Sequence, residues 1–364
     1  MESTFELAHS PDHAREPAHY SIPIAMHNLT ETKLVRHEFA YLILSHGELD
    51  QVIRLMKTIR IGSPLSAILL HHDAKNPAPD EEMLQRLNVQ LVSPRISAAW
   101  GDFSLVDAVL NSVSYTLRAI DFDWLVVLSG QDYPLRPFST LESELRNSPY
   151  DAFVKATPVS MGPYGFRYYM RYWKLPKMPF IHRLPSPIQE ILGCAQKKLS
   201  QSKTWLRIQP GPRNTPTRLG LGIFGHPFSN TFVCHKGSQW FTLSKRAAAY
   251  LIQFGQKQPN ILGHYRQTLI PDESYFQTVL WNAKDLRVCE DHRRFILWDD
   301  AKLAHPVTLT MQHYDSMIQS GKDFGRKFDM AVDAKVLDAL DQVVLGPQHT
   351  ESKQGANNVF PAQA

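Results

Sequence analysis

The sequence predicts an α/β protein with a mostly parallel central sheet and helices on both of its faces. Short continuous apolar runs, such as residues 39–44 and 67–70, are typical of parallel strands buried on both sides. Apolar residues at helical spacing separate these runs, so strands and helices alternate along the chain. The 364 residues are 43% hydrophobic and 20% charged, an ordinary globular composition that argues against a disordered, collagen-like or coiled-coil chain.

The individual elements follow in chain order. The run at 39–44 is a first strand, apolar residues from Leu49 to Met56 indicate a helix, and 67–70 is a second strand, which completes a βαβ unit. A helix with Ser104 as its N-cap is expected between a third and a fourth strand. The remaining expected elements are strands at 89–92, 124–128, 239–243 and 294–298, and helices at 245–254, 272–280 and 331–345.

Three segments fall outside this pattern. Residues 1–36 are expected to be a flexible leader and residues 347–364 a disordered tail, so that residues 37–346 form a single domain. Proline, glycine, basic and aromatic residues dominate residues 158–230, which predicts a long basic insertion, irregular apart from a helix near 187–200. Between Arg167 and Arg218 there are eleven basic residues and one acidic residue, Glu190. This excess suits an anionic membrane surface or substrate.

The expected location of the protein follows from its cysteines and its hydropathy. Cys194, Cys234 and Cys289 are too few and too widely spaced for a disulfide framework or a CxxC zinc site. No apolar run is long enough to cross a bilayer, and the first residues lack the pattern of a signal peptide. We therefore expect a cytoplasmic protein that contacts the inner membrane face, if at all, peripherally through residues 167–218.

Polar side chains follow two of the predicted strands. His72 and Asp73 end the second strand, and Asp132 follows the fourth. Ligands of parallel α/β sheets gather at the carboxyl ends of the strands, so these residues are candidates for a nucleotide site. Adjacent histidines on an extended chain point to opposite faces, so His71 and His72 do not easily grip one metal ion. A metal-dependent hydrolase built on these histidines and Asp73 is an alternative that EDTA-sensitive activity would support.

Two acidic motifs have competing interpretations. Asp121 and Asp123 form a DxD pair, but the pair precedes the fourth strand and is expected at the opposite edge of the sheet. The motif Pro-Asp-Glu at 271–273 precedes an apolar run. Asp272 is therefore either a helix cap, with Glu273 complementing the helix dipole, or the neighbour of a general base, Glu273, at a cleft.

Arg326 and Lys327 lie between two aromatic residues near the end of the chain. They form either a solvated basic turn or a diphosphate site, in which arginine donates a fork of hydrogen bonds and lysine adds a point charge. Fixed positive charge of this kind can replace a metal ion at a leaving diphosphate.

Seven segments in order resemble the core-2/I-branching β-1,6-N-acetylglucosaminyltransferase family, which also contains the peptide O-xylosyltransferases. Any one motif is weak, but the ordered set is specific and runs from about residue 39 to 329. Few cysteines and no anchor make the chain look like a bacterial cytoplasmic member. The segments are 40–46 (AYLILSH), 70–73 (LHHD), 100–104 (WGDFS), 128–135 (LSGQDYPL), 237–241 (GSQWF), 271–276 (PDESYF) and 305–329, ending in FGRKFD.

The resemblance implies a GT-A-type fold and an inverting, metal-independent transfer of a sugar from a UDP-sugar to a hydroxyl of a glycan or glycolipid. N-acetylglucosamine is the expected sugar, and no cofactor, metal or nucleic acid is expected. Glu273 matches the catalytic base, and Arg326 and Lys327 match the pair that holds the diphosphate. Donor contacts are expected from His72, Asp73 and Asp132, and acceptor-side positions from Gln239, Trp240 and Asp272.

The chain departs from the family pattern at three positions. Gln239 stands where xylosyltransferases carry an acid, and Asp102 where many members have a second glycine. Val307 occupies the place of a further arginine of the branching enzymes, with Arg293 or Arg294 as substitutes. UDP-xylose or a UDP-hexose is therefore an alternative donor, and a catalytically silent nucleotide- or glycan-binding protein is an alternative function.

Overall fold

The computed structural model describes residues 34–162, 165–175, 206–209, 216–222, 224–298 and 306–346. The predicted tail, the predicted helix near 187–200 and nearly all of the predicted leader lie outside these residues, so the predicted domain limits stay predictions. The first strand begins at Arg36, the last residue of that leader. Among the described residues, no helix combines the length and the apolar character that crossing a bilayer requires.

Seven described strands form the central sheet in the order β11-β6-β10-β4-β1-β2-β3. Strand β1 pairs in parallel with β2 and β4, whereas β10 is antiparallel to both β4 and β6. The predicted mostly parallel sheet is therefore confirmed. The bounds are β1 Arg36–Ser45, β2 Ala67–His72, β3 Val89–Leu91, β4 Asp121–Ser129, β6 Ala152–Pro158, β10 His235–Ser244 and β11 Val288–Cys289.

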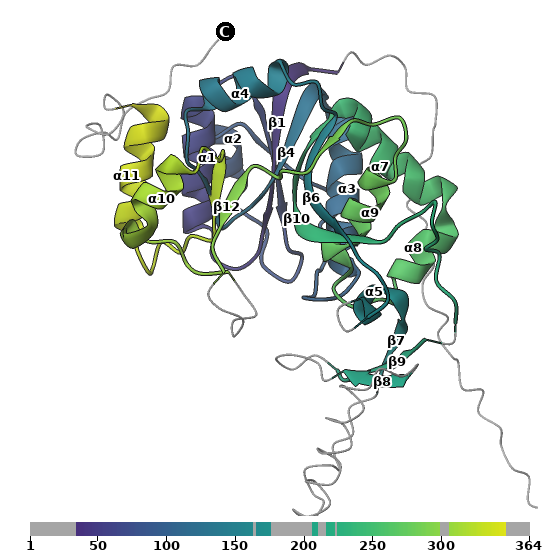
Figure 1. Cartoon of the computed structure of the whole chain (residues 1–364). Helices are drawn as coiled ribbons and strands as arrows, with labels where there is room; N and C mark the ends of the chain where they lie inside the picture. Colours follow the sequence, from purple (N-terminus) through teal and green to yellow (C-terminus); the bar gives the residue numbers. More distant parts are fainter. Residues whose placement is uncertain are drawn as a thin grey trace, which may run out of the picture. The chain divides into compact units, whose positions relative to one another are not determined.

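Helices cover both faces of this sheet (Figure 1). The helix capping follows ordinary chemistry, since Asp80, Ser244 and Asp333 accept backbone N–H bonds at the starts of α2, α7 and α11. One face carries α3 (Ser104–Ala119), α7 (Lys245–Lys257), α8 (Pro259–Tyr265) and α9 (Tyr275–Trp281). The other carries α1 (Asp50–Gly62), α2 (Glu81–Arg86), α4 (Phe138–Arg146), α10 (Tyr314–Gln319) and α11 (Ala334–Leu345).

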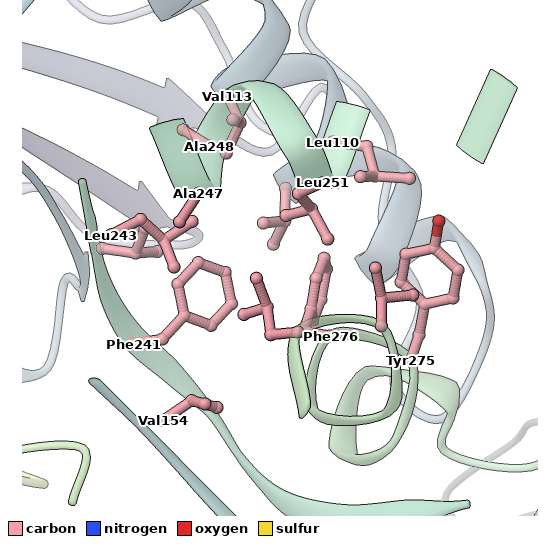
Figure 2. Packing of buried hydrophobic residues seen from close by; sticks show 14 of the residues in the cluster. Leu110, Val113, Val154, Phe241, Leu243, Ala247, Ala248, Leu251, Tyr275 and Phe276 are labelled. Carbon is pink, nitrogen blue, oxygen red and sulfur yellow. The ribbon is translucent and has the colours of Figure 1, made fainter. Parts of the chain in front are cut away.

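Because helices cover both faces of the central sheet, its strands need apolar side chains on both sides, which explains their continuous apolar runs. Along β1, Ala40 and Leu42 point into one core, while Tyr41 and Ile43 point into the other. Figure 2 shows the first core, where Phe241 of β10 packs against α9, with its ring centroid 5.1 Å from that of Phe276. Each fully buried large side chain contributes about 1.5–3 kcal/mol relative to exposure, so this packing fixes β10 against its helices. Figure 2 also labels Leu110 and Val113 of α3, Val154 of β6, Leu243 of β10, Ala247, Ala248 and Leu251 of α7, and Tyr275 of α9.

Two smaller three-stranded sheets complete the described structure. One consists of β12 (Arg294–Ile296), β13 (Phe324–Arg326) and β5 (Asp132–Pro134), and the other of β7 (Arg171–Lys174), β9 (Arg218–Leu221) and β8 (Leu206–Gln209). The second sheet and α5 (Phe166–Tyr169) fall in the predicted insertion. The prediction of irregular chain there is wrong for these segments. Strands of four residues are too short to leave a periodic signal in sequence.

Candidate active site

Neighbouring parallel strands end together at one edge of the central sheet. Ser45 of β1 lies opposite His72 of β2, and Ser129 ends β4 beside them. The Ser45 hydroxyl lies 2.9 Å from Nδ1 of His72, whose side chain is buried. Burial and nearby Arg95 lower the pKa of His72, so its ring is neutral at neutral pH. His72 and Asp73 thus lie at the predicted edge, while their contact with a donor stays a prediction.

Asp73 ties two loops together at this edge. Its carboxylate accepts the Lys75 N–H at 2.8 Å and the Ala98 N–H at 3.1 Å. Its own N–H donates to the Ser45 carbonyl. An ionised carboxylate has about four lone-pair positions, so Asp73 keeps acceptor capacity for a ligand N–H or O–H group.

The neighbouring histidine and the DxD motif have structural partners. Nε2 of His71 accepts the Ile96 N–H at 2.9 Å, and burial lowers the pKa of His71. Asp121 pairs with Arg36 and Lys245 where β4 begins, so the predicted place of the DxD pair at the opposite edge is confirmed. Within the described ranges, no three His, Cys, Asp or Glu side chains are grouped to hold a metal ion.

Arg326 is in direct contact with both Asp132 and Trp240. Arg326 lies opposite Asp132 in the antiparallel pair of β13 and β5, and its Nη1 donates to Oδ1 of Asp132 at 3.0 Å. The guanidinium carbon lies 4.3 Å from the centroid of the Trp240 ring, a cation–π distance. Arg326 is therefore held between a carboxylate and an aromatic face. The structure thus brings a predicted donor residue and a predicted acceptor-side residue together around a predicted diphosphate residue.

Lys327 follows directly after β13 and is partly buried. Its carbonyl accepts the Leu309 N–H, which fixes the backbone. No hydrogen bond or ion pair joins its ammonium group to another described residue. A lysine of this kind beside a fixed arginine gives the site one immobile fork and one adaptable point charge.

Trp240 lies near the carboxyl edge of the sheet because β10 is antiparallel to its neighbours β4 and β6. Thr242 pairs with Val126 of β4, so the residues before Thr242 lie toward the end of β4. The ladder with β6 is interrupted between Gly237 and Phe241, the stretch that contains Gln239 and Trp240. A Cβ on Gly237 would lie 1.7 Å from the Lys155 carbonyl, so only glycine fits there.

Asp272 and Glu273 lie in a one-turn 3-10 helix, η2 (Pro271–Glu273), before α9. The predicted helix over 272–280 is therefore broken, and α9 begins after Ser274 without a side-chain cap. The capping interpretation of Asp272 is wrong. Its side chain is 6% exposed, and its buried Oδ1 has no partner among the described residues. Burial and the charge of Glu273 raise the pKa of Asp272 to about 7.

Glu273 is only partly buried, and no hydrogen bond to its carboxyl is formed by the described residues. Burial raises its pKa, against the opposing effect of Arg167 and Lys236. The next residue anchors the turn to β10, because the Ser274 hydroxyl donates to the His235 carbonyl at 2.7 Å. Sequence reasoning missed the proximity of Lys236 and Arg167 to this acid, and no motif signals it.

Strand β10 therefore lies next to both Glu273 and Arg326. Lys236, near Glu273, and Trp240, against Arg326, are four residues apart on β10. Four residues of extended chain span at most about 14 Å. Glu273 and Arg326 accordingly flank the same short stretch of the carboxyl edge.

The loop 100–104 lies against the turn that carries Glu273. The Gly101 carbonyl accepts the Ile270 N–H at 3.3 Å and a bond from Arg218 at 3.0 Å. Asp102 pairs with Lys174 at 2.8 Å. Ser104 is the first residue of α3 rather than its N-cap, because its hydroxyl accepts the Ala99 N–H instead. A cavity of about 200 Å³ opens beside this loop, lined by Asp102, Phe103, Ser104, Asp107, Tyr172, Lys174, Arg218, Arg266 and Thr268.

Neither candidate for the missing family arginine is available to a ligand. Arg293 is paired with Asp323 and Glu144. Arg294 is buried and donates to the carbonyls of Val127 and Phe241, which pins β12 to the central sheet. Of Arg293, Arg294, Arg326 and Lys327, the last two therefore keep donors for a ligand.

This fold and this edge define an α/β protein with an acid and a pair of cations where such proteins bind nucleotides. The model of the Core-2/I-Branching enzyme family matches residues 39–319. The chain therefore belongs to the Core-2/I-Branching enzyme family.

Curated relatives have related activities in their names. The chain is 26% identical over 354 residues to beta-glucuronosyltransferase GlcAT14C of Arabidopsis thaliana, covering 93% of this chain and 82% of the relative. It is 26% identical over 324 residues to beta-glucuronosyltransferase GlcAT14A of Arabidopsis thaliana, covering 84% and 64%. It is 24% identical over 352 residues to xylosyltransferase oxt of Drosophila melanogaster, covering 88% and 35%. The chain thus spans less than two thirds of the length of two of these relatives.

Proposed function

We propose that this protein is an inverting glycosyltransferase that moves N-acetylglucosamine from its UDP donor to a hydroxyl of a glycan or glycolipid, without a divalent metal. The observation that carries the proposal is the pairing of an acid and a cation site along one strand. The pKa of Glu273 is raised, and no described residue forms a hydrogen bond with its carboxyl. Glu273 lies near Lys236 of β10, and the same strand continues to Trp240, whose ring contacts Arg326.

Inversion needs one base and one leaving-group site. Glu273 removes the proton of the acceptor hydroxyl while the oxygen attacks the anomeric carbon from the face opposite UDP. The bond from the anomeric carbon to the diphosphate oxygen breaks, and the proton stays on Glu273. UDP leaves without needing a proton, so the growing charge on its diphosphate is stabilised by Arg326 and Lys327. These two cations supply the positive charge that a metal ion supplies in other transferases.

The names of the relatives favour a second set of donors on the same scaffold. Two are beta-glucuronosyltransferases and one is a xylosyltransferase. UDP-glucuronic acid and UDP-xylose are therefore the alternative donors. The chemistry at Glu273, Arg326 and Lys327 is the same for each.

The proposal includes a contact between the basic residues at 167–218 and an anionic membrane. Several of its described cations already have partners inside the protein: Lys174 and Arg218 pair with Asp102, and Arg207 lies over the Phe166 ring. We therefore expect any contact of residues 167–218 with an anionic membrane to be made by the other basic residues of the segment.

Calorimetric titration with UDP-N-acetylglucosamine, UDP-xylose, UDP-glucuronic acid and UDP-glucose, with and without EDTA, tests the proposal. Saturable binding of one sugar nucleotide that is unchanged by EDTA is the expected result. Binding that disappears in EDTA would contradict the metal-free site. Absence of binding to every UDP-sugar would contradict the proposed function itself.

A further inference from the structure

We infer that Asp132 and Trp240 are positioning residues that hold the Arg326 guanidinium in one orientation for the diphosphate of the donor. The inference rests on the proposed function, because it concerns the same leaving-group site. It assigns to Asp132 and Trp240 a role through Arg326, in place of direct contact with donor sugar or acceptor.

The carboxylate of Asp132 is fixed from two sides. Its Oδ2 accepts the Ser129 N–H at 3.0 Å at the end of β4, and its Oδ1 accepts from Arg326 at 3.0 Å. The side chain is 0% exposed. Residues directly opposite in an antiparallel pair have side chains on the same face, so the pairing of β5 and β13 brings the two groups together. A fully buried carboxylate whose oxygens are engaged in this way is poorly placed to meet a sugar.

Trp240 restrains the same guanidinium from a third strand. Its ring centroid lies 4.3 Å from the guanidinium carbon, while the Arg326 side chain is 12% exposed. The contact with the ring restrains the guanidinium on one side, and the bond to Asp132 restrains its rotation. Asp132 occupies one of the five guanidinium donors. The other donors remain for two diphosphate oxygens in a geometry set before the ligand arrives.

Three substitutions separate this positioning role from direct contact with a ligand. Trp240→Leu fills part of the indole volume without an aromatic face, whereas Trp240→Phe keeps a face. A cation–π contact is worth about 0.5–2 kcal/mol, which is about 2- to 30-fold in affinity. Asp132 uses both carboxylate oxygens, one for the Ser129 N–H and one for Arg326, whereas asparagine has a single acceptor oxygen, so Asp132→Asn cannot keep both bonds. The substitution also removes the negative charge beside Arg326, so it does not weaken the attraction of the diphosphate by charge.

The experiment compares Trp240→Leu, Trp240→Phe and Asp132→Asn with the wild type in the full chain. Calorimetry gives the Kd of UDP and of uridine, and steady-state transfer gives kcat and the KM of the acceptor. Trp240→Leu is expected to weaken UDP binding about 2- to 30-fold, with uridine binding and acceptor KM unchanged. Trp240→Phe is expected to stay close to the wild type. Asp132→Asn is expected to lower kcat about tenfold or more, with the Kd of UDP nearly unchanged, since misplacing a catalytic group costs rate.

Three outcomes would overturn the inference. A higher acceptor KM for Trp240→Leu with unchanged UDP binding would place Trp240 at the acceptor. A folded Asp132→Asn variant with wild-type kcat would mean that Arg326 needs no positioning, and if this variant does not fold, the two Trp240 variants decide. Absence of UDP binding to the wild type would overturn the proposed function together with the inference, which distinguishes that failure from the other two.

Discussion

Replacing Asp272 by asparagine is expected to change how the stability of the protein depends on pH. Burial and the charge of Glu273 raise the pKa of Asp272 from its ordinary 3.8 to about 7. In the unfolded chain the carboxyl loses its proton near the ordinary value. Between these two pKa values the folded state binds more protons than the unfolded state, so the free energy of unfolding falls as pH rises.

The size of this effect follows from the two pKa values. At about 1.36 kcal/mol per pKa unit, the difference between 3.8 and about 7 corresponds to about 4 kcal/mol. This stability is fully present below the unfolded pKa and is lost as pH rises through the folded pKa. Asparagine has no proton to lose, so the variant should gain about 4 kcal/mol relative to the wild type between about pH 4 and about pH 8.

Urea unfolding at several pH values between these limits measures the effect directly. Asp315→Asn is the matched control, because it removes the same charge from an exposed position on α10. The difference in unfolding free energy between Asp272→Asn and wild type should widen with pH, while that of the control stays constant. Parallel pH dependences for wild type and Asp272→Asn would refute a raised pKa at this carboxyl.

Three further predictions concern the acid, the cations and the strand between them. Because the pKa of Glu273 is raised above 4.5 and the base acts when deprotonated, kcat/KM should rise with pH through a pKa above that value; a profile already flat at about pH 5 would contradict this. Lys327→Ala should weaken UDP binding far more than uridine binding in calorimetry, and equal losses would separate the lysine from the diphosphate. Gly237→Ala, whose Cβ would meet the Lys155 carbonyl, should cost about 1–3 kcal/mol in urea unfolding, and wild-type stability would refute the close approach of β6 and β10.

The central part of the fold is predictable from the sequence because its strands are buried on both faces. The predicted strands at 39–44, 67–70 and 124–128 match β1, β2 and β4, which extend beyond them at one end or both. The predicted helix at 245–254 matches α7, with Ser244 as its cap. Continuous apolar runs and helical spacing are strong signals when an element is long.

The contacts within the site are not predictable in the same way. Asp132 and Arg326 are 194 residues apart and meet through strands of three residues each. No periodicity exists at that length, so the family resemblance placed both residues near the donor without revealing their contact. The break between η2 and α9 is equally hidden, because it lies at Ser274, whose φ of −140° is not helical and has no signal in the sequence. The turn before it begins at Ile270 with a φ of 48°, a conformation that is not expected of a β-branched residue.

Glu273 acting as the base is the central step of the proposed sugar transfer. The decisive measurement is kcat for transfer by Glu273→Gln, with the Kd of UDP measured on the same preparation. We expect kcat to fall about 10²- to 10⁴-fold while UDP binding stays nearly intact, since glutamine keeps the shape of the side chain but accepts no proton. A variant that retains more than about a tenth of the wild-type kcat would contradict the assignment of Glu273 as the base.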